Sequence, residues 1–292
     1  MYNQFDISVC VITYNHSSFI KKCLDNILCQ KLNYNWEIII ADDYSTDGTR
    51  EILKDYKNRN SDKIKLILQE KNVGAAQNWM DLIQMSNSKY IAYIEGDDFW
   101  CDENKLQKQV DFLINNPKYV ICSHNVYLEI NGNLIAREKL NSEYRFNDFL
   151  KSSIINSVSI VYRNTKLPDW IINCPFGDWG LYLYLSKFGK TAVLDDYSAV
   201  YRIHNQGIYT GLNNKNEKMI SFLEFIKEHF PENKEEINKI IIDKKVFLGL
   251  TSLSIGSILS GKTTFKELIY FFKTMVLRKL KRNTSHGVSH NH

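Results

Sequence analysis

The N-terminal part of the chain repeats one pattern four times, and this repetition limits the folds that it can adopt. Each repeat is a short apolar run rich in β-favouring residues, then a polar loop, then a segment with apolar residues at helical spacing. The apolar runs cover residues 7–12, 36–41, 64–68 and 90–94, and the helical segments cover 19–28, 49–56, 75–85 and 103–114. This alternation predicts an α/β fold with a mostly parallel central sheet and helices on both of its faces.

Polar side chains follow each of the four predicted strands. They are Thr13 and Asn15, then Asp42 and Asp43, then Asn72, and finally Glu95, Asp97 and Asp98. In open parallel sheets, ligands bind at the carboxyl ends of the strands. The sequence therefore predicts that these side chains line a common crevice.

After Pro117 the pattern changes. Residues 119–129 and 134–137, around the turn Asn131-Gly132, predict a hairpin. Further strands are predicted at 158–162, 191–194 and 198–203, a helix at 179–187, and helices at 217–230, 234–259 and 264–280. A loop rich in Gly and Asn precedes these last three helices. We therefore expect an α/β domain over residues 1–215 and a C-terminal helical region over residues 216–292.

Composition places the chain among ordinary globular proteins. Of its 292 residues, 44% are hydrophobic and 24% are charged, which is enough for a substantial core. The six cysteines are scattered and no basic segment leads into an apolar run at the N-terminus, so we expect reduced thiols and a cytoplasmic location. The longest apolar stretch, residues 246–259, is shorter than the roughly 20 residues that a membrane span needs.

The acidic turn Glu95-Gly96-Asp97-Asp98 follows the fourth predicted strand. A hard divalent cation on a diphosphate takes oxygen ligands from one or two carboxylates, which this turn offers. An acidic cluster also suits the positive end of a helix dipole, so the turn alone supports both interpretations. Asp42-Asp43 also supports two interpretations, because such carboxylates bind ribose hydroxyls in nucleotide folds and also cap helices.

Four motifs together resemble a known family. They are Val11-Ile12-Thr13-Tyr14-Asn15, the run from Glu37 to Asp43 with Ser45-Thr46-Asp47-Gly48-Thr49, then Asn72-Val73-Gly74, and Glu95-Gly96-Asp97-Asp98-Phe99-Trp100. In this order and spacing they resemble the inverting family-two glycosyltransferases of the GT-A fold, of the type that builds bacterial envelope polysaccharides. The resemblance covers about residues 5–210, and it implies the GT-A fold with a nucleoside-diphosphate sugar as donor.

The resemblance implies a role for several of these residues. Asp97 would coordinate Mn²⁺ or Mg²⁺ on the donor diphosphate, and Glu95 would face the ribose or the outer shell of the metal. The nucleotide-sugar site would be completed by Thr13, Tyr14, Asn15, Asp42, Asn72 and Gly74. Two positions depart from the family pattern: Asp is more common at position 95, and a basic residue is common where Gln77 stands.

The second half of the chain supplies the other residues that the resemblance implies. Asp178, in Phe176-Gly177-Asp178-Trp179, matches the general base at the start of an acceptor-side helix, although Gly177 replaces a commonly acidic neighbour. An aspartate there is also suited to capping the helix. In Tyr201-Arg202-Ile203-His204, the motif implies that His204 binds the metal and that Arg202 approaches the diphosphate.

These expectations describe a metal-dependent inverting transferase. It would move a sugar from a nucleoside-diphosphate donor, with a UDP-sugar as the preferred candidate, to a hydroxyl of a glycan or lipid-linked acceptor. Two other functions stay open. A nucleotide-sugar-binding scaffold subunit would keep the donor site and lack turnover. A sugar nucleotidyltransferase also uses a nucleotide and a metal on an α/β sheet, but the chain has no Gly-rich basic loop near its first strand.

The C-terminal segment carries most of the excess positive charge. Residues 262–283 contain seven Lys or Arg and one Glu, with apolar residues on one side of a predicted helix. This pattern fits a helix on an anionic membrane surface, which would place the enzyme peripherally on the inner face of the cytoplasmic membrane. It fits equally a helix packed on the catalytic domain. Because the excess of basic over acidic residues is confined to this segment, we expect no nucleic-acid partner.

Overall fold

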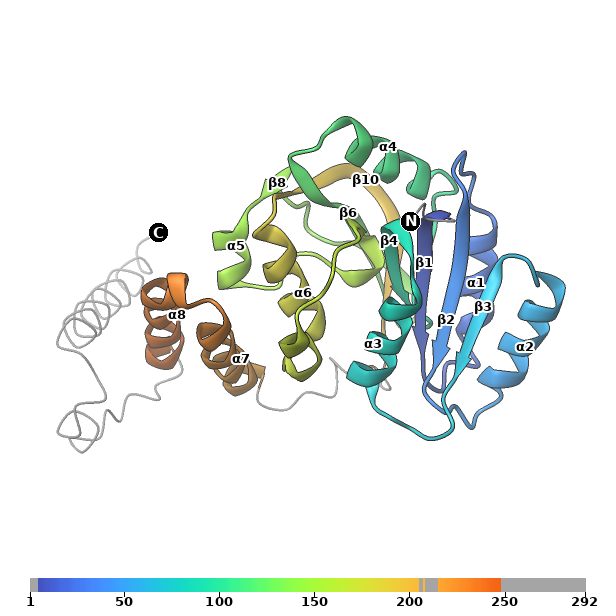
Figure 1. Ribbon diagram of the computed structural model, residues 1–292, viewed down its shortest axis with the longest axis horizontal. Coiled ribbons are helices and arrows are strands. Elements are labelled where there is room, and N and C mark those ends of the chain that lie inside the picture. Colours follow the sequence, from blue (N-terminus) through green and yellow to red (C-terminus); the bar gives the residue numbers. More distant parts are fainter. Residues whose placement is uncertain (1–4, 205–206, 208–214, 248–292) are drawn as a thin grey trace, which may run out of the picture. The chain divides into compact units, whose positions relative to one another are not determined.

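The computed structural model describes residues 5–204, 207 and 215–247. The chain divides into two compact units, Met1–Gly211 and Leu212–His292. The first unit contains the sheet, and the described part of the second is helical (Figure 1). The prediction that residues 1–215 and 216–292 are domains with different roles stays a prediction.

Four parallel strands form the N-terminal part of the sheet. They are β1 (Phe5–Thr13), β2 (Trp36–Asp42), β3 (Ile64–Leu68) and β4 (Ser88–Glu95), in the spatial order β3-β2-β1-β4. Thr13 of β1 pairs in register with Asp42 of β2, and Ile12 pairs with Glu95 of β4. The carboxyl ends of β1, β2 and β4 therefore lie at one edge of the sheet.

The remaining strands continue the same sheet beyond β4. The short β9 (Val161–Arg163) is antiparallel to β4 and to β6 (Tyr119–Ile130), so β6 runs in the direction of β4. Because β10 (Lys190–Ile203) is parallel to β6, its carboxyl end returns to the edge where β1, β2 and β4 end. Three short strands pair at the far side: β5 (Phe99–Trp100) and β8 (Glu143–Tyr144) with β10, and β7 (Asn133–Ala136) with β6.

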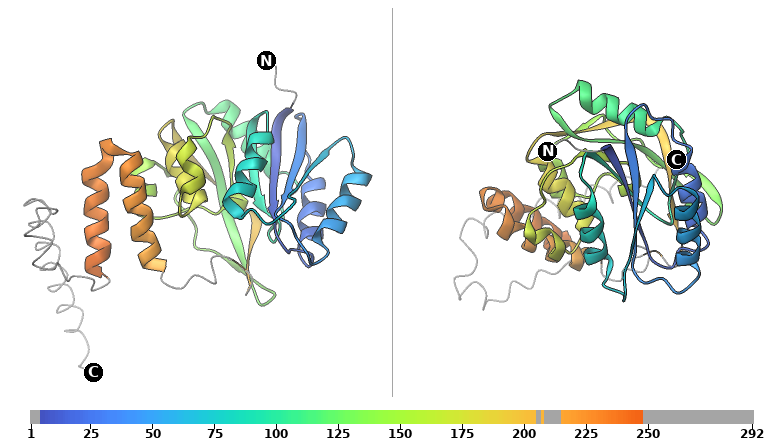
Figure 2. Two further views of the ribbon diagram at one scale, coloured as in Figure 1. Left: turned by 60° about the horizontal axis from the view of Figure 1, so that its bottom comes forward. Right: turned by 45° about the vertical axis from the view of Figure 1, so that its right-hand side comes forward.

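Helices cover both faces of the sheet. They are α1 (Ile20–Leu28), α2 (Thr49–Arg59), α3 (Ala75–Met85), α4 (Lys105–Asn115), α5 (Phe146–Lys151) and α6 (Gly177–Ser186). Figure 2 shows α1 and α2 on one side of the N-terminal strands and α3 on the other. The predicted fold class, a mostly parallel α/β sheet between helices, is confirmed.

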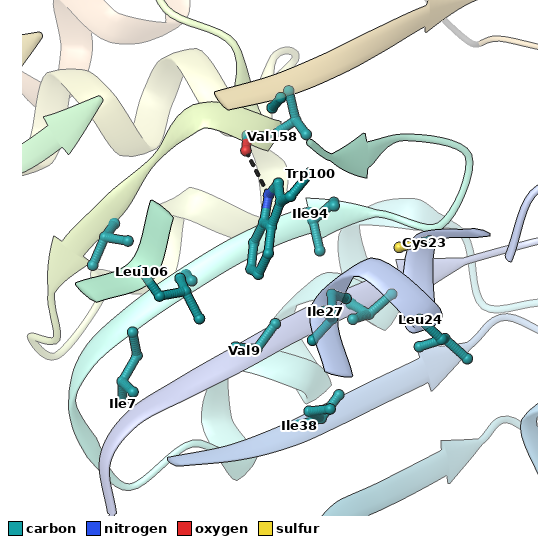
Figure 3. Packing of buried hydrophobic residues seen from close by; sticks show 14 of the residues in the cluster. Ile7, Val9, Cys23, Leu24, Ile27, Ile38, Ile94, Trp100, Leu106 and Val158 are labelled. Atoms are coloured by element: carbon teal, nitrogen blue, oxygen red, sulfur yellow. Dashed lines mark hydrogen bonds between the residues drawn. The ribbon is translucent and has the colours of Figure 1, made fainter. Parts of the chain in front are cut away.

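The core beneath the carboxyl edge is apolar and closely packed (Figure 3). Val9 of β1, Ile38 of β2 and Leu24 of α1 are completely buried, and each such side chain contributes about 1.5 to 3 kcal/mol. Trp100 is also buried, and its Nε1 donates a hydrogen bond to the carbonyl oxygen of Val158 at 2.9 Å. The loops at the edge of the sheet are therefore anchored on a rigid support.

Three predicted strands have different bounds in the structure. The strand predicted at 158–162 is present only in its second half, because Ser157–Ser159 forms a 3₁₀ turn and β9 begins only at Val161. Ser159 Oγ donates to the carbonyl oxygen of Asn156, and such local bonds compete with a strand ladder. The strands predicted at 191–194 and 198–203 are one strand, β10, whose register against β6 shifts between Leu194 and Ala199.

The described part of the second unit contains two helices and a connecting 3₁₀ turn. They are α7 (Lys215–His229), Pro231–Asn233 and α8 (Lys234–Phe247). These helices match the starts of those predicted at 217–230 and 234–259. The predicted helix at 264–280, with the basic segment, lies outside the described residues. Among the helices that are described, none is long and apolar enough to cross a membrane.

Candidate functional site

The loops that follow β1 and β2 are joined by hydrogen bonds at the carboxyl edge of the sheet. The amide of Asn15 donates to Ser45 Oγ at 2.8 Å, and the amide of Thr46 donates to Asn15 Oδ1 at 2.9 Å. The amide of His16 donates to Thr49 Oγ1 at 2.9 Å, which ties the first loop to the start of α2. Two segments about thirty residues apart in the chain thus form one ordered surface, because each satisfies the other's polar groups.

Asp42 lies inside this surface. Its Oδ1 accepts the amide hydrogen of Ser45 at 3.1 Å, and its Oδ2 accepts the hydroxyl of Ser45. Arg50 Nε lies 3.2 Å from Oδ1. Burial raises the pKa of Asp42, while the hydrogen bonds from Ser45 and the charge of Arg50 oppose the shift. Both carboxylate oxygens are engaged by the protein, so Asp42 shapes the loop that a nucleotide would meet.

Asp43 binds the loop that leads into α3. Its two oxygens accept the amide hydrogens of Val73 at 2.7 Å and Gly74 at 3.0 Å. Asn72 Nδ2 donates to the carbonyl oxygen of Asp43 at 3.3 Å. Gly74 has φ of 86°, a conformation that favours glycine. The predicted residues Asn72 and Gly74 are thereby brought beside the first two loops.

The acidic turn is packed tightly against the β1 loop. The amide of Gly96 donates to the carbonyl oxygen of Ile12 at 2.8 Å. A Cβ at position 96 would lie 2.9 Å from Thr13 Oγ1 and 3.0 Å from His16 Nδ1, so only glycine fits without a shift. Within the described part of the chain, Thr13 Oγ1 and His16 Nδ1 are buried and have no hydrogen-bond partner. This close approach places the next residue, Asp97, beside the β1 loop.

Asp97 faces two imidazoles. Its Oδ2 lies 2.9 Å from His204 Nε2 and 3.9 Å from His16 Nε2. Burial lowers the pKa of His16, and the charge of Asp97 only partly opposes the shift. His16 is therefore a neutral imidazole near pH 7, the form that coordinates metals. The structure thus brings the predicted ligands Asp97 and His204 together and places His16 near Asp97.

Asp98 and Arg202 hold the acidic turn against the end of β10. The buried Asp98 accepts the amide hydrogen of Arg202 at 2.8 Å, and Arg202 Nη1 donates to the carbonyl oxygen of Asp97 at 2.5 Å. The guanidinium also lies 4.5 Å from the ring centre of Phe99. Burial raises the pKa of Asp98 well above its ordinary value, and Asp97 and Glu95 add to the shift. Asp98 supports the turn, and Arg202 brings a fixed positive charge to it.

Glu95 and Asp178 form the part of the site nearer to the second half of the sheet. Glu95 accepts a hydrogen bond from Ser157 Oγ at 2.7 Å. Burial raises the pKa of Glu95, helped by the charges of Asp97 and Asp178 and opposed by Ser157. Glu95 is thus held toward Ser157 and is electrostatically linked to Asp178.

Asp178 lies in the first turn of α6, and no side-chain cap is formed there. Its Oδ1 accepts the amide hydrogen of Trp179 at 2.8 Å. The side chain is exposed to solvent, yet the surrounding protein displaces enough water to raise its pKa, and the bond from Trp179 opposes that shift. A solvent-accessible carboxylate with a raised pKa can take up a proton from a hydroxyl.

The donor set fits a cation that is shared with a diphosphate. Across residues 5–204, 207 and 215–247, no group of three or more His, Cys, Asp or Glu side chains is arranged to hold a metal ion. A cation bound to a diphosphate needs only one or two protein ligands, because phosphate and water supply the rest. The carboxylate of Asp97 with the imidazole of His204 meets that requirement, and the buried, unpartnered atoms of Thr13 and His16 border it.

Two residues of the site, His16 and Ser157, were not predicted. His16 lies in the loop that carries Thr13 to Asn15, and its signal was its proximity to that motif. Asp43 was predicted to line the crevice, but without a role of its own. Ser157 had no signal in the sequence, because its role depends on the long-range contact with Glu95. Gln77, which departs from the family pattern, donates to Asp81 Oδ1 within α3 at 2.6 Å.

Sequence comparisons identify relatives of the chain. A family model described as glycosyl transferase family 2 matches residues 8–170. An uncharacterized protein of Mycobacterium bovis is 33% identical over 208 residues, or 70% of this chain and 60% of that protein. TuaG of Bacillus subtilis, named a putative teichuronic acid biosynthesis glycosyltransferase, is 27% identical over 69% of this chain and 81% of its own length. The chain thus spans only about three fifths of the mycobacterial relative.

Solved structures share the fold. TarS of S. aureus in complex with UDP-GlcNAc has a TM-score of 0.62 and 16% identity, covering 92% of this chain and 79% of that chain. The mannosyltransferase PcManGT from Pyrobaculum calidifontis, in complex with GDP-Man and Mn²⁺, has a TM-score of 0.58 and 14% identity, covering 95% of this chain and 86% of its own. The GT-A fold that the motifs implied is confirmed. Since the family model covers more than half of its residues, the chain belongs to glycosyl transferase family 2.

Proposed function

We propose that this protein is a metal-dependent inverting glycosyltransferase, which moves a sugar from a nucleoside-diphosphate donor to a hydroxyl of a glycan or lipid-linked acceptor. The convergence of Asp97, His204 and Arg202 at the edge where four strands end carries the proposal. A UDP-sugar is the donor that we favour, in line with the UDP-GlcNAc bound to TarS. The name of TuaG supports a role in cell-envelope polysaccharide synthesis.

The nucleotide would lie against the joined loops after β1, β2 and β3. Tyr14 and Asn15 would contact it from the first loop, over the buried Thr13, and Asn72 and Gly74 would contact it from the third. Asp42 acts by holding Ser45 and Arg50, since its own oxygens are occupied. A site whose loops are already bonded to one another loses little conformational entropy when the donor binds.

Asp97 and His204 would hold Mn²⁺ or Mg²⁺ on the diphosphate. When bound, the cation would act as a Lewis acid and offset the negative charge of the leaving diphosphate. Arg202 adds a positive charge that is fixed by its contacts with Asp97 and Phe99. Preorganised charge of this kind stabilises a developing anion without reorganisation during the reaction.

Asp178 would act as the general base, with Glu95 oriented beside it by Ser157. The acceptor hydroxyl gives its proton to Asp178 while its oxygen forms a bond to the anomeric carbon. The bond from that carbon to the phosphate oxygen breaks, and its electron pair leaves with the nucleoside diphosphate. Because attack and departure occur on opposite faces of the sugar, the configuration inverts.

Transfer assays with matched variants test the proposal. UDP-, GDP- and dTDP-sugars are offered with and without Mn²⁺, and release of nucleoside diphosphate and sugar transfer are measured. We expect Asp178→Asn to lower turnover by roughly a hundredfold or more while it keeps nucleotide binding. Asp97→Ala should abolish stimulation by the metal. Asp195→Asn changes an exposed carboxylate that pairs with Lys139 on the surface, and it should leave turnover unchanged.

The outcome also separates the alternatives. Nucleotide-sugar binding without turnover for any donor would identify a scaffold subunit. Release of pyrophosphate from a nucleoside triphosphate in the presence of a sugar phosphate would identify a nucleotidyltransferase. Either result would replace the transferase proposal.

We further propose that the protein works peripherally at the inner face of the cytoplasmic membrane, where lipid-linked acceptors are available. The seven basic residues of segment 262–283 support this location, since each adds attraction to anionic lipid. Sedimentation of the full chain with anionic and with neutral vesicles, at low and high salt, tests it. Retention that is independent of lipid charge would contradict the proposal.

A further inference from the structure

Two exposed tyrosines lie in the loops that follow β1 and β2, at the carboxyl edge of the sheet. Tyr14 has 46% of its surface exposed, and Tyr44 has 42%. Each directly precedes one partner of the hydrogen bond between Asn15 and Ser45. Because Thr13 and Asp42 pair in register, both rings belong to one short stretch of the sheet edge. Exposed aromatic rings at a candidate ligand site favour a binding role over a packing role.

The backbone of Tyr44 is held in a conformation that favours glycine. Its φ is 64°, in the left-handed region, where a side chain with a Cβ is disfavoured by roughly 1 kcal/mol. The loop keeps this conformation because Ser45 is bonded to Asp42 by both its amide and its hydroxyl. A glycine would serve the backbone better, so the side chain of Tyr44 is retained at a conformational cost.

The ring of Tyr44 is oriented by Arg50. The guanidinium carbon of Arg50 lies 5.4 Å from the ring centre. Arg50 is itself fixed, because its Nε lies 3.2 Å from Asp42 Oδ1 and its Nη2 donates to the carbonyl oxygen of Gln69 at 3.0 Å. One face of the ring thus meets a cation, and the exposed surface remains available to another planar group.

We propose that Tyr44 stacks on the nucleobase of the donor. The inference rests on the proposed function, which supplies the nucleotide. A nucleobase is planar and partly polar, so it suits an oriented aromatic ring that is still solvent-exposed. Stacking uses the face that every base has, so Tyr44 contributes to the affinity of nucleoside diphosphates in general and not to that of pyrophosphate.

The test compares UDP, GDP and inorganic pyrophosphate as probes of the full-length protein in the presence of Mn²⁺, by isothermal titration calorimetry. Tyr44→Gly removes the ring at a backbone position that glycine prefers, so we expect it to fold with unchanged or increased thermal stability. We expect this variant to bind UDP and GDP about tenfold more weakly and pyrophosphate as the wild type does. Tyr44→Phe keeps the ring and should retain nearly all of the affinity.

Asn131→Gly is the matched control. Asn131 is also a non-glycine residue with positive φ, at 50°, in the turn between β6 and β7. The same backbone change there should leave the affinity for UDP unaltered. Equal UDP affinity in the wild type and in Tyr44→Gly would overturn the inference alone. A wild type that binds pyrophosphate and neither nucleotide would overturn the inference together with the proposed donor site.

Discussion

The carboxylate of Asp178 combines solvent access with a raised pKa. A group with these properties is protonated at a higher pH than an ordinary aspartate, whose pKa is 3.8. Below the raised pKa it holds a proton and cannot act as a base, and above it the carboxylate is free to accept one. The proposed role therefore has a direct consequence for the pH dependence of transfer.

We expect kcat/KM for transfer to fall with decreasing pH along a limb whose midpoint lies above 3.8, because Asp178 becomes protonated. The affinity for Mn²⁺ and UDP, measured over the same pH range, separates this limb from a loss of ligand binding at low pH. A limb that follows the binding curve at every pH would assign it to ligand binding and would contradict the role of Asp178 as base.

At the scale of the element, the loops after β1, β2 and β3 behave as one unit because of a few side-chain bonds to backbone amides. Asp43 provides two of these bonds, to Val73 and Gly74. Removal of the acceptor leaves two partly buried amide hydrogens without a protein partner, which costs about 1 to 3 kcal/mol. Asp43 thus connects the stability of the fold to the shape of the donor site.

Asp43→Ala should lower the free energy of unfolding by roughly 1 to 3 kcal/mol and raise the KM for the donor, because the β3–α3 loop loses both of its anchors. Asp43→Asn keeps one acceptor oxygen and should show a smaller effect in the same direction. Urea unfolding and donor kinetics measure the two quantities. An Asp43→Ala protein with wild-type stability and KM would show that the loop is held by other contacts.

The elements of the first half were predictable, because strand and helix periods alternate clearly up to Ile114. The failures have local physical causes. The segment at 158–162 is apolar enough for a strand, but a hydroxyl bond from Ser159 closes a turn first, so the strand begins only at Val161. At the centre of β10, Asp195 and Asp196 interrupt the apolar pattern, and the strand continues through them with a shift in register.

In the site, pairs of residues adjacent in sequence were the hardest to assign. Neighbours at a strand end point in different directions, so no periodicity distinguishes Asp42, bonded to its own loop, from Asp43, bonded to the α3 loop. The pairing of Asp97 with His204 and of Glu95 with Ser157 joins residues far apart in the chain. For His204 a family motif carried the information, and for Ser157 no motif was available.

At the scale of the whole molecule, the site gathers acidic groups that repel one another. Burial raises the pKa of Glu95 and of Asp98, and neighbouring carboxylates raise both further: Asp97 and Asp178 for Glu95, and Asp97 and Glu95 for Asp98. Arg202 offsets part of this charge through its contacts with the acidic turn. A bound cation that relieves the rest would stabilise the folded protein as well as the donor.

We expect Mn²⁺ with UDP, at about a hundredfold excess over the dissociation constant, to stabilise the protein by about 2.7 kcal/mol and to raise Tm by roughly 5 to 10 °C. Asp97→Ala should melt at or above the wild-type temperature without ligand, because one repelling charge is gone, and should gain little from Mn²⁺. Differential scanning calorimetry measures both. A strong loss of stability in ligand-free Asp97→Ala would show that Asp97 acts mainly as a structural residue.

If the protein has the proposed function, the mutual repulsion in the acidic turn would also affect its lifetime in a cell. A fold that is completed by its donor and cation spends more time locally open when these are scarce, and open chains are the ones that proteases cleave. Supply of nucleotide sugar would then regulate the amount of enzyme as well as its rate. An enzyme of this construction would be removed when it has nothing to transfer and preserved while it is in use.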